Sequence, residues 1–458
     1  MKKILILFFS IINPLLSIEE IKDRAQKTTY YVHEICKPKS VNELQKFVLT
    51  AKTPIAIAGS RFSQGGQTVS DRGSVINMKY LNQVMALDVE KQSITVQAGI
   101  TWREIQQFID SYDLSILVMQ SYNDFSVGGS LAVNAHGREL SHGQLIDTVQ
   151  SLKIMLADGN IITANRNENY ELFRAIIGSY GKLGIIIEAT LQLTKNEKVE
   201  RHIQWLKAKD YPTYFFDSIK SDPTALLHNA NLYPNDFSHV LCITWHETNK
   251  PLTINKHLQT NQPFYPKMIF FEQILRRISH SKAIRPYFER WQLSSADVVM
   301  RNYEMSYSVN TLRQPIHFPT VSILQEYFIP IECFDQFIEV LQKLTKEYNI
   351  NIINASIRHI PAQTESLLTY APTDSFAFVL YINKWNTING TRYQEIWTRE
   401  LIDASLNLGG KYYLPYEFLA SKEQFNRAYP NIALYKELTQ KYDPENIFNN
   451  LFWTTYGY

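Results

Sequence analysis

The sequence contains few cysteines and no cluster of them. Cys36, Cys242 and Cys333 are the three cysteines among 458 residues, and they lie far apart. No Cys-x-x-Cys pair occurs, which argues against a structural zinc site, and we expect no bound metal. An odd number of widely spaced thiols leaves at least one of them free, so a disulfide framework is not indicated.

An excess of charge is also missing. The net charge is +2, and charged residues amount to 20% of the chain. Nucleic-acid-binding proteins carry a basic patch or stripe, and no long basic tract is present, so we expect no nucleic-acid partner. Hydrophobic residues make up 45% of the chain. This value is ordinary for a globular protein, and the length favours two domains.

Long hydrophobic runs are absent beyond the N-terminus, where Lys2 and Lys3 precede an apolar stretch over residues 4–16. A basic start before a short apolar stretch is typical of a secretory signal, and the stretch is short for a membrane span. We therefore predict a signal peptide over residues 1–17 and export to the periplasm or to its membrane face. The cleavage-site pattern is poor, so an uncleaved anchor or a cytoplasmic protein with an apolar N-terminus stays open.

Residues 25–197 combine short strands and helices without the regular βαβ order of a Rossmann domain, which indicates an α+β fold. Ser40–Glu43 and Thr101–Glu104 have the pattern of capping boxes at helix starts. Ala-Asp-Gly-Asn at 157–160 is a hairpin turn signal between two strands. The other expected elements are strands at 54–58, 75–78, 84–87, 94–96 and 184–193, and a helix at 168–177.

A rise in polarity after Lys195 marks the end of this first domain. The following chain alternates expected strands and helices. This pattern predicts a second α+β domain over residues 198–440, an antiparallel sheet covered by helices. Its clearest elements are strands at 240–244, 324–329 and 376–382 and helices at 334–346 and 391–408.

Three glycine-bearing loops lie in the first domain. Ala58–Gly66 follows a strand directly, so successive backbone N–H groups can form an anion cradle. Ser126–Gly137 contains glycines that let the backbone approach a flat ligand closely. Gly181–Ile185 leads into a strand. None matches the Walker phosphate loop, and one glycine-rich loop alone is more often a turn, so the order and spacing of all three is the informative feature.

Together these loops resemble the FAD-binding module of the vanillyl-alcohol oxidase superfamily, the type shared with p-cresol methylhydroxylase. The resemblance covers residues 30–195 and implies a two-subdomain module that binds FAD. Gly59–Ser63 would wrap the pyrophosphate, the second loop would follow the pyrophosphate and the isoalloxazine, and Ile186 would meet the adenosine end. The implied cofactor-binding residues are Ala58, Gly59, Ser60, Arg61, Phe62, Ser63, Ser121, Ser126, Val127, Gly128, Gly129, Ser130, Asn134, His136, Gly137, Gly181, Gly184, Ile185, Ile186 and Tyr413.

The second half is similar to the substrate domain of sugar and polyol oxidases, namely aldonolactone oxidases, alditol oxidases and decaprenylphosphoryl-ribose oxidase. Leu324–Pro330 resembles their Glu-bearing strand, and Ile357–Pro361 resembles a neighbouring active-site strand. Gly409–Tyr416 and Tyr442–Phe448 are typical of the terminal segment that returns to the flavin. The resemblance implies a cap domain with an antiparallel sheet and a tail, residues 441–458, that returns to the first domain.

Alcohol oxidation by a flavin needs a group that takes the hydroxyl proton and groups that stabilise developing charge. Glu326, Arg358, His359 and Lys384 lie on strands that, by the resemblance, face the flavin, and they are the catalytic candidates. His359 is a candidate base because a histidine titrates near neutrality. Arg358 and Lys384 are candidates to hold negative charge on the reduced flavin. Neighbouring strand residues alternate faces, so at most one of Arg358 and His359 points into the site.

Two positions depart from the family pattern. Many members carry a histidine before the serine of the first loop, linked covalently to the flavin, and Phe62 stands there. A phenyl ring has no lone pair with which to bond the flavin, so we predict non-covalent FAD. The Arg-Pro-His-Trp-Gly-Lys run of aldonolactone oxidases is also absent, and Tyr416 takes the place of the catalytic lysine of decaprenylphosphoryl-ribose oxidase.

These observations predict an FAD-dependent oxidoreductase acting on a CH–OH group of a sugar, polyol, aldonolactone or related alcohol, with oxygen or another electron acceptor. A reductase of the type that acts on enolpyruvyl nucleotide sugars is the alternative enzyme. A flavin-binding protein with a decayed substrate site is the alternative outside catalysis. The basic, aromatic stretch Phe264–Trp291 is expected to form packed helices with solvated charges, with a peripheral membrane contact as the alternative.

Overall fold

A computed structural model describes residues 19–22, 29–234, 236–259, 281–309 and 320–457. The predicted signal peptide, residues 1–17, lies outside these ranges, as do residues 264–280 of the basic aromatic stretch. Within the described ranges, no helix combines the length and the apolar character that crossing a membrane requires.

A small parallel sheet forms the first subdomain. Strands β3 (Glu34–Cys36), β5 (Ser74–Asn77) and β4 (Ile55–Ala58) lie in that order, and helix α1 (Val41–Thr50) connects β3 to β4. The Ser40 side chain caps α1 by accepting a hydrogen bond from the Glu43 backbone, as predicted. The Glu43 carboxylate instead accepts from Lys39, so only half of the expected capping box forms. A hairpin of β1 (Glu19–Lys22) and β2 (Thr29–Val32) precedes the sheet.

An antiparallel sheet forms the second subdomain, in the order β10, β9, β11, β7, β6, with β8 also paired to β11. Its strands are β6 (Val84–Asp88), β7 (Ser93–Gln97), β8 (Leu114–Ile116), β9 (Val149–Met155), β10 (Ile161–Ala164) and β11 (Ile185–Lys195). Its helices are α2 (Trp102–Ile109), α3 (Val127–Ala132) and α4 (Tyr170–Ile176). The predicted β9–β10 hairpin and the Thr101–Glu104 capping box are both present. Helix α3 lies inside a stretch predicted as loop.

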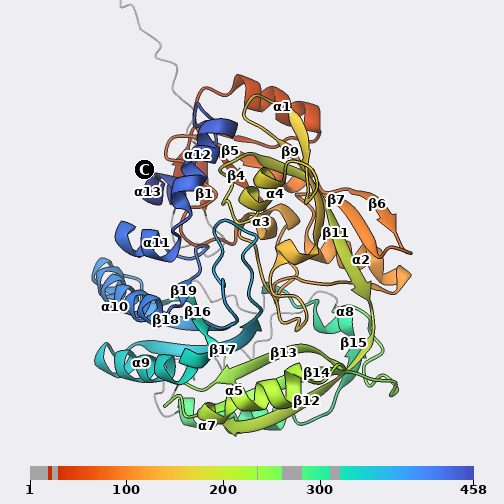
Figure 1. The fold of residues 1–458 in the computed structure, drawn as a ribbon, viewed down its shortest axis with the longest axis vertical. Helices are drawn as coiled ribbons and strands as arrows, with labels where there is room; N and C mark the ends of the chain where they lie inside the picture. Colours follow the sequence, from red (N-terminus) through yellow and green to blue (C-terminus); the bar gives the residue numbers. More distant parts are fainter. Residues whose placement is uncertain (1–18, 23–28, 235, 260–280, 310–319, 458) are drawn as a thin grey trace, which may run out of the picture.

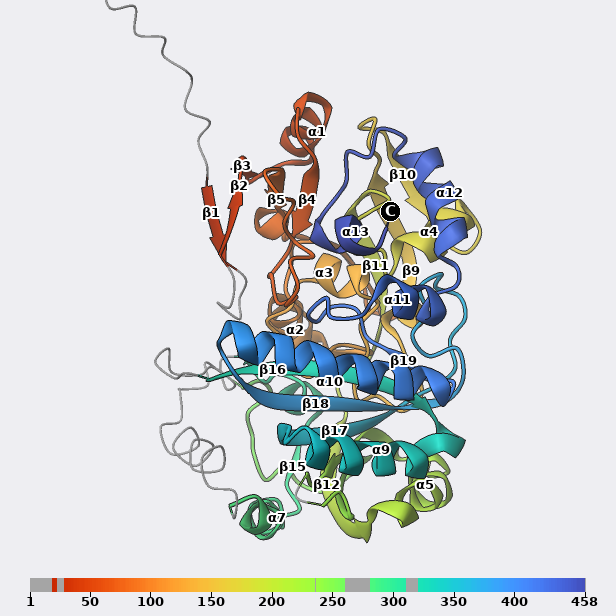
Figure 2. The same ribbon diagram turned by 90° about the vertical axis from the view of Figure 1, so that its left-hand side faces the viewer.

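The cap domain is built on eight antiparallel strands in the order β15, β12, β14, β13, β17, β18, β16, β19. These are β12 (Lys198–Lys207), β13 (Ala225–Leu232), β14 (His239–Glu247), β15 (Val298–Met300), β16 (Thr320–Pro330), β17 (Asn351–Ile360), β18 (Ser375–Trp385) and β19 (Lys411–Tyr412). Its helices are α5 (Tyr211–Tyr214), α7 (Ser281–Gln292), α8 (Arg301–Glu304), α9 (Phe334–Glu347) and α10 (Ile388–Asn407). Helices α9 and α10 run side by side along β16 and β18 (Figure 2). The predicted α+β class is confirmed.

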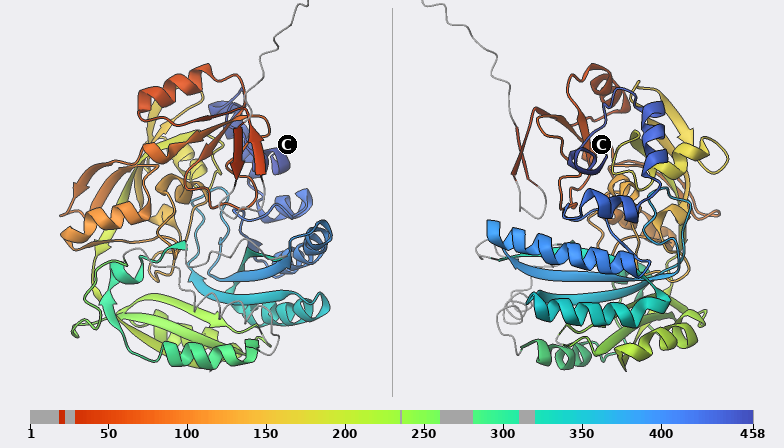
Figure 3. Two further views of the ribbon diagram at one scale, coloured as in Figure 1. Left: turned by 180° about the vertical axis from the view of Figure 1, so that it is seen from behind. Right: turned by 60° about the vertical axis from the view of Figure 1, so that its left-hand side comes forward.

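The C-terminal segment leaves the cap and lies against the first domain (Figures 1 and 3). It contains α11 (Lys422–Ala428), α12 (Ile432–Tyr442) and α13 (Leu451–Tyr456). Phe448 forms a parallel bridge with Ile55 of β4, and Trp453 Nε1 donates to the Ser179 carbonyl at 2.9 Å. Lys441 on α12 already pairs with Glu171 of the first domain, so the return begins before residue 441.

Helix α7 carries the described part of the basic aromatic stretch. Arg285 pairs with Glu289, and the Arg290 guanidinium lies over the Trp205 ring. Tyr287 and Trp291 are 72% and 73% exposed. The helix therefore has a packed face that takes up its arginines and an exposed aromatic face.

Candidate active site and cofactor cavity

A cavity of about 530 Å³ lies between the first domain and the cap. One wall contains residues of all three glycine-bearing loops. The opposite wall contains the first residues of β16, the end of β18, and Tyr413 and Tyr416 from the segment after β19. The loops that the sequence singled out therefore meet at one place, at the domain boundary.

Gly59 and Ser126 join the first two loops. Ser126 Oγ accepts a hydrogen bond from the Ser60 backbone at 3.2 Å. A Cβ at residue 59 would lie 2.0 Å from that oxygen, so glycine leaves the room for this contact. Arg61 then adopts a φ of 60°, in the left-handed region that few non-glycine residues adopt. The whole run from Gly59 to Ser63 lines the cavity as a result.

Gly128 and Gly184 let backbone segments pack closely behind the cavity. The Gly128 N–H donates to the Ala98 carbonyl at 2.7 Å, and a Cβ at residue 128 would come within 2.9 Å of the Ala98 Cβ. Gly184 has a φ of 148°, and its Cβ would meet the Met155 carbonyl oxygen at 2.9 Å.

The structure divides the predicted cofactor residues into two groups. Those that line the cavity are Gly59, Ser60, Arg61, Phe62, Ser63, Ser126, Gly128, Gly129, Gly181, Gly184, Ile186 and Tyr413. Those that do not line it are Ala58, Ser121, Val127, Ser130, Asn134, His136, Gly137 and Ile185. The second group was assigned by continuity along the motif, but successive residues of a strand or helix face different sides. Val127 and Ile185, for example, are buried in the hydrophobic cores.

Glu326 on β16 forms the centre of a buried polar cluster behind this wall. His136 Nε2 lies 2.5 Å from its Oε1, and the Tyr416 hydroxyl donates to its Oε2 at 3.0 Å. Burial alone would raise the pKa of Glu326, but His136, Arg358 and Tyr416 together hold it below its usual range. The side chain is 3% exposed, so it is a buried carboxylate that stays ionised at neutral pH.

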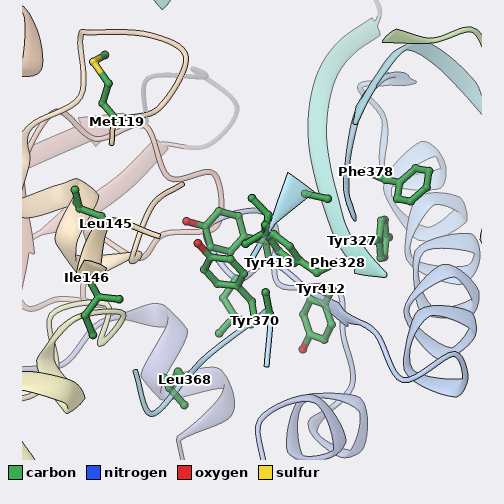
Figure 4. Close-up of a cluster of buried hydrophobic side chains, with 14 of the residues drawn as sticks. Met119, Leu145, Ile146, Tyr327, Phe328, Leu368, Tyr370, Phe378, Tyr412 and Tyr413 are labelled. Atoms are coloured by element: carbon green, nitrogen blue, oxygen red, sulfur yellow. The ribbon is translucent and has the colours of Figure 1, made fainter. Parts of the chain in front are cut away.

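Aromatic rings enclose His136 and keep it against Glu326. Tyr370 and Tyr413 lie side by side next to Phe328 (Figure 4). The His136 ring contacts all three, with centroid distances of 5.6–5.9 Å. The two tyrosine hydroxyls donate to the Asn134 and Val133 carbonyls. These two hydrogen bonds tie the second loop to the cap just before His136.

Arg358 on β17 approaches the cluster from the cap side. Its Nη2 donates to Ser121 Oγ at 2.9 Å, which joins β17 to the segment before the second loop. The Arg358 side chain is half-buried, and its positive charge helps to hold the pKa of Glu326 down. Arg358 on β17 and Glu326 on β16 therefore carry opposite charges on two strands of the cap sheet.

His359 and Lys384 do not reach the cavity. His359 points to the opposite face of β17 and packs against Phe215, Phe216 and Phe376. Burial and the charge of Lys220 lower its pKa to about 4, so the structure does not support the hypothesis that it is the base. Lys384 instead bonds Gln394 and Glu417. Strand alternation explains both corrections.

Several cavity residues carried no signal in the sequence that singled them out as ligand contacts. They include Gln64, Gln120, Tyr122, Tyr381, Asn386 and Tyr416. With 27 tyrosines in the chain, no single one stands out. For Tyr416 the available clue was its alignment with a catalytic lysine in a relative.

Comparison with known proteins agrees with this geometry. Residues 33–165 match the family described as FAD binding domain, and residues 231–456 match the family described as D-arabinono-1,4-lactone oxidase. The chain belongs to the vanillyl-alcohol oxidase and p-cresol methylhydroxylase superfamily of FAD-linked oxidoreductases. Both the superfamily assignment and FAD as the cofactor are confirmed.

Individual members of the superfamily match over the whole fold or over one part of the sequence. A solvent-stable cholesterol oxidase covers 96% of this chain with a TM-score of 0.72 and 18% identity; the chain covers 98% of it. Mitochondrial D-lactate dehydrogenase [cytochrome] of Arabidopsis thaliana is 35% identical over 34% of this chain and 30% of its own length. L-gulonolactone oxidase of Mus musculus is 30% identical over 34% of this chain. The matches span about a third of the length of these curated relatives.

The cavity of this superfamily member suits FAD. Its first-domain wall includes the glycine-bearing loops, whose backbone N–H groups can hold a pyrophosphate. The cavity runs from Met78 and Ile186 inside the first domain to Tyr381 and Asn386 of the cap. Only the cap end brings in side chains near Glu326, so the redox-active ring belongs at that end and the adenosine at the other.

Proposed function

We propose that the protein is an FAD-dependent oxidoreductase that oxidises a CH–OH group of a sugar, a polyol, an aldonolactone or a related alcohol. The observation that carries this proposal is the buried carboxylate of Glu326, one hydrogen bond behind Tyr416 at the cap end of the cavity. Oxidation of an alcohol removes a hydride from carbon and a proton from oxygen. FAD, when bound, supplies the hydride acceptor, so the chain itself must supply the proton acceptor.

Tyr416 and Glu326 are arranged to take that proton. Tyr416 lines the cavity and donates its own proton to Glu326, which leaves a lone pair on its oxygen for the substrate proton. As the substrate proton arrives, the tyrosine proton passes to the carboxylate, so no phenolate forms. This route matters because burial and the Glu326 charge raise the pKa of Tyr416 well above its usual range.

His136 and Arg358 prepare Glu326 for this role. His136 occupies Oε1 and thereby directs Oε2 to Tyr416. Arg358 adds, beside His136, a positive charge that helps to keep the carboxylate ionised before the reaction. Glu326 and Tyr416 form the proton route, whereas His136 and Arg358 are positioning residues.

The described cap-side wall supports a neutral substrate. It is formed by Val309, Thr320, Val321, Ser322, Leu324, Tyr381, Asn386, Tyr413, Pro415 and Tyr416. Among the described residues, these side chains offer hydroxyls and one amide but no cation. Two phosphates of a nucleotide sugar would call for cationic partners. The wall therefore favours alcohol oxidation over the reduction of an enolpyruvyl nucleotide sugar.

A panel of alditols, aldoses and aldonolactones, mixed anaerobically with the purified protein, tests the proposal. At least one alcohol should bleach the yellow absorbance, and Glu326→Gln should be bleached by dithionite but only slowly by that alcohol. Bleaching by NADPH and by no alcohol would favour the reductase. Bleaching by dithionite alone would indicate a protein without a working substrate site.

We also propose export to the periplasm or its membrane face. The support is the sequence of Lys2, Lys3 and the apolar stretch that follows. Fractionation of cells that make C-terminally tagged protein tests this proposal. Recovery from the cytoplasm alone, with residues 1–17 intact by mass spectrometry, would contradict it.

A further inference from the structure

Gln120 borders the cavity just before the second loop. Its side chain lines the cavity, and its Oε1 lies 2.9 Å from Nε1 of Trp102. The Trp102 side chain is fully buried in the first domain, on α2. A polar side chain at the cavity is therefore held from behind by a residue that cannot move easily.

The partner fixes which end of the amide faces the cavity. An indole nitrogen only donates, so the atom of Gln120 that faces it must be the carbonyl oxygen. If the amide were rotated by 180°, its NH₂ group would face the indole N–H, and two donors would be placed against each other. Ser130 Oγ also lies 3.0 Å from this oxygen, but it lies 2.9 Å from the Ser126 carbonyl as well, so its single proton has two acceptors and Trp102 is the donor that fixes the amide. The Gln120 NH₂ group must point away from Trp102, and the described residues give it no protein acceptor.

This amide lies at the ring end of the cavity. The next residue, Ser121, accepts from Arg358, and Arg358 acts on Glu326. Tyr122 and Tyr416 line the same cavity. Gln120 is thus next to the contacts that join the first domain to the catalytic cluster of the cap.

We propose that Gln120 donates a hydrogen bond from its amide to the flavin ring, and that Trp102 is the positioning residue that sets its orientation; the proposal rests on FAD occupying the cavity. A donor directed at the ring stabilises the electron density that the ring gains on reduction. The contact therefore binds reduced FAD more tightly than oxidised FAD and raises the midpoint potential.

The midpoint potential of bound FAD, measured by spectroelectrochemical titration of the holoenzyme, tests this inference without a substrate. Gln120→Leu removes the donor and should weaken the preference for reduced FAD about tenfold. For a two-electron couple this corresponds to a potential about 30 mV lower. Trp102→Phe removes the donor that holds the amide and should shift the potential in the same direction by less. Both variants should retain FAD and change its visible absorption bands.

Gln107→Leu is the matched control because Gln107 is exposed on α2, near Trp102. It should leave the potential and the spectrum unchanged. If Gln120→Leu purifies without FAD, Gln120→Asn, which withdraws the same amide, takes its place. Wild-type potential in FAD-loaded Gln120 and Trp102 variants overturns the inference. Absence of flavin from the wild-type protein would instead contradict the proposed function.

Discussion

The two walls of the cavity are lined by different kinds of residue. The first-domain wall includes five glycines, among them Gly59, Gly128 and Gly184, whose close contacts leave no room for a Cβ, and it faces a cofactor whose shape is constant. The cap wall consists mainly of side chains from β16, β18 and the segment after β19, with Glu326 and His136 behind it. The glycines of the first-domain wall tolerate almost no substitution, whereas the side chains of the cap wall can be altered at each position. Binding of the cofactor and choice of substrate should therefore respond to different mutations.

The sharpest contrast should come from the proton acceptor. Glu326→Gln keeps the shape but removes the charge, so we expect turnover to fall roughly 100-fold or more while FAD content stays near that of the wild type. Stopped-flow reduction and flavin absorbance measure the two quantities. Glu339→Gln, exposed on α9 of the same domain, is the control and should change neither. Equal loss of FAD and of turnover would break the division between the walls.

The converse substitution is made at a glycine of the first-domain wall. Gly184→Ala places a Cβ near the Met155 carbonyl at a φ of 148°, which should cost about 3 kcal/mol or more of stability. We expect a lower melting temperature and a large loss of bound FAD. Gly409→Ala has a comparable left-handed φ of 77° but an open surrounding, with a nearest atom at 3.7 Å. It should cost less and leave FAD content unchanged.

Arg358→Ala separates positioning from proton transfer. Without the guanidinium, the pKa of buried Glu326 should rise, because Arg358 is one of the groups that lower it. We expect turnover to fall about tenfold or more and the acidic limb of the kcat/KM profile to move to higher pH. The variant should retain its FAD. A lower rate with an unchanged pH profile would mean that Arg358 acts by another route.

His359, the neighbour of Arg358, should affect stability in place of activity. Burial lowers the pKa of His228 to about 3 and that of His359 to about 4. Below pH 6.5 these two histidines become protonated in the unfolded chain but stay neutral in the folded protein. The free energy of unfolding therefore falls as the pH drops from 7 to 5. Each should contribute roughly 2 kcal/mol to that loss. His359→Phe should reduce the loss, measured by urea unfolding, and leave turnover unchanged.

The smallest expected effect concerns the cofactor linkage. Phe62 lines the cavity and packs on Phe125 at 4.7 Å, and a phenyl ring forms no bond to the flavin. Acid precipitation should leave the yellow colour in the supernatant. Colour in the pellet would contradict the prediction and direct peptide mapping to the histidines.

Sequence reasoning succeeded where local chemistry determines the structure. The capping box of Thr101 and the Asp-Gly hairpin are set by neighbouring residues, and the three loops are marked by glycines that the backbone requires. It failed where the face of a strand decides which environment a side chain enters. Arg358 and His359 are adjacent, yet one meets Ser121 and the other a phenylalanine cluster. Tyr416 and Gln120 gain their roles from partners 90 residues and 18 residues away, respectively, which local patterns do not reveal.

The bracing of the third loop by the C-terminal segment has a consequence for biosynthesis. Trp453 bonds the Ser179 carbonyl from 274 residues further along the chain, and Lys182 bonds the Phe448 carbonyl from 266 residues away. The residues of the third loop leave the ribosome long before their partners in the C-terminal segment are synthesised. One wall of the cavity in the nascent first domain is therefore unsupported until α13 has left the ribosome, and stable capture of FAD is expected only after that point.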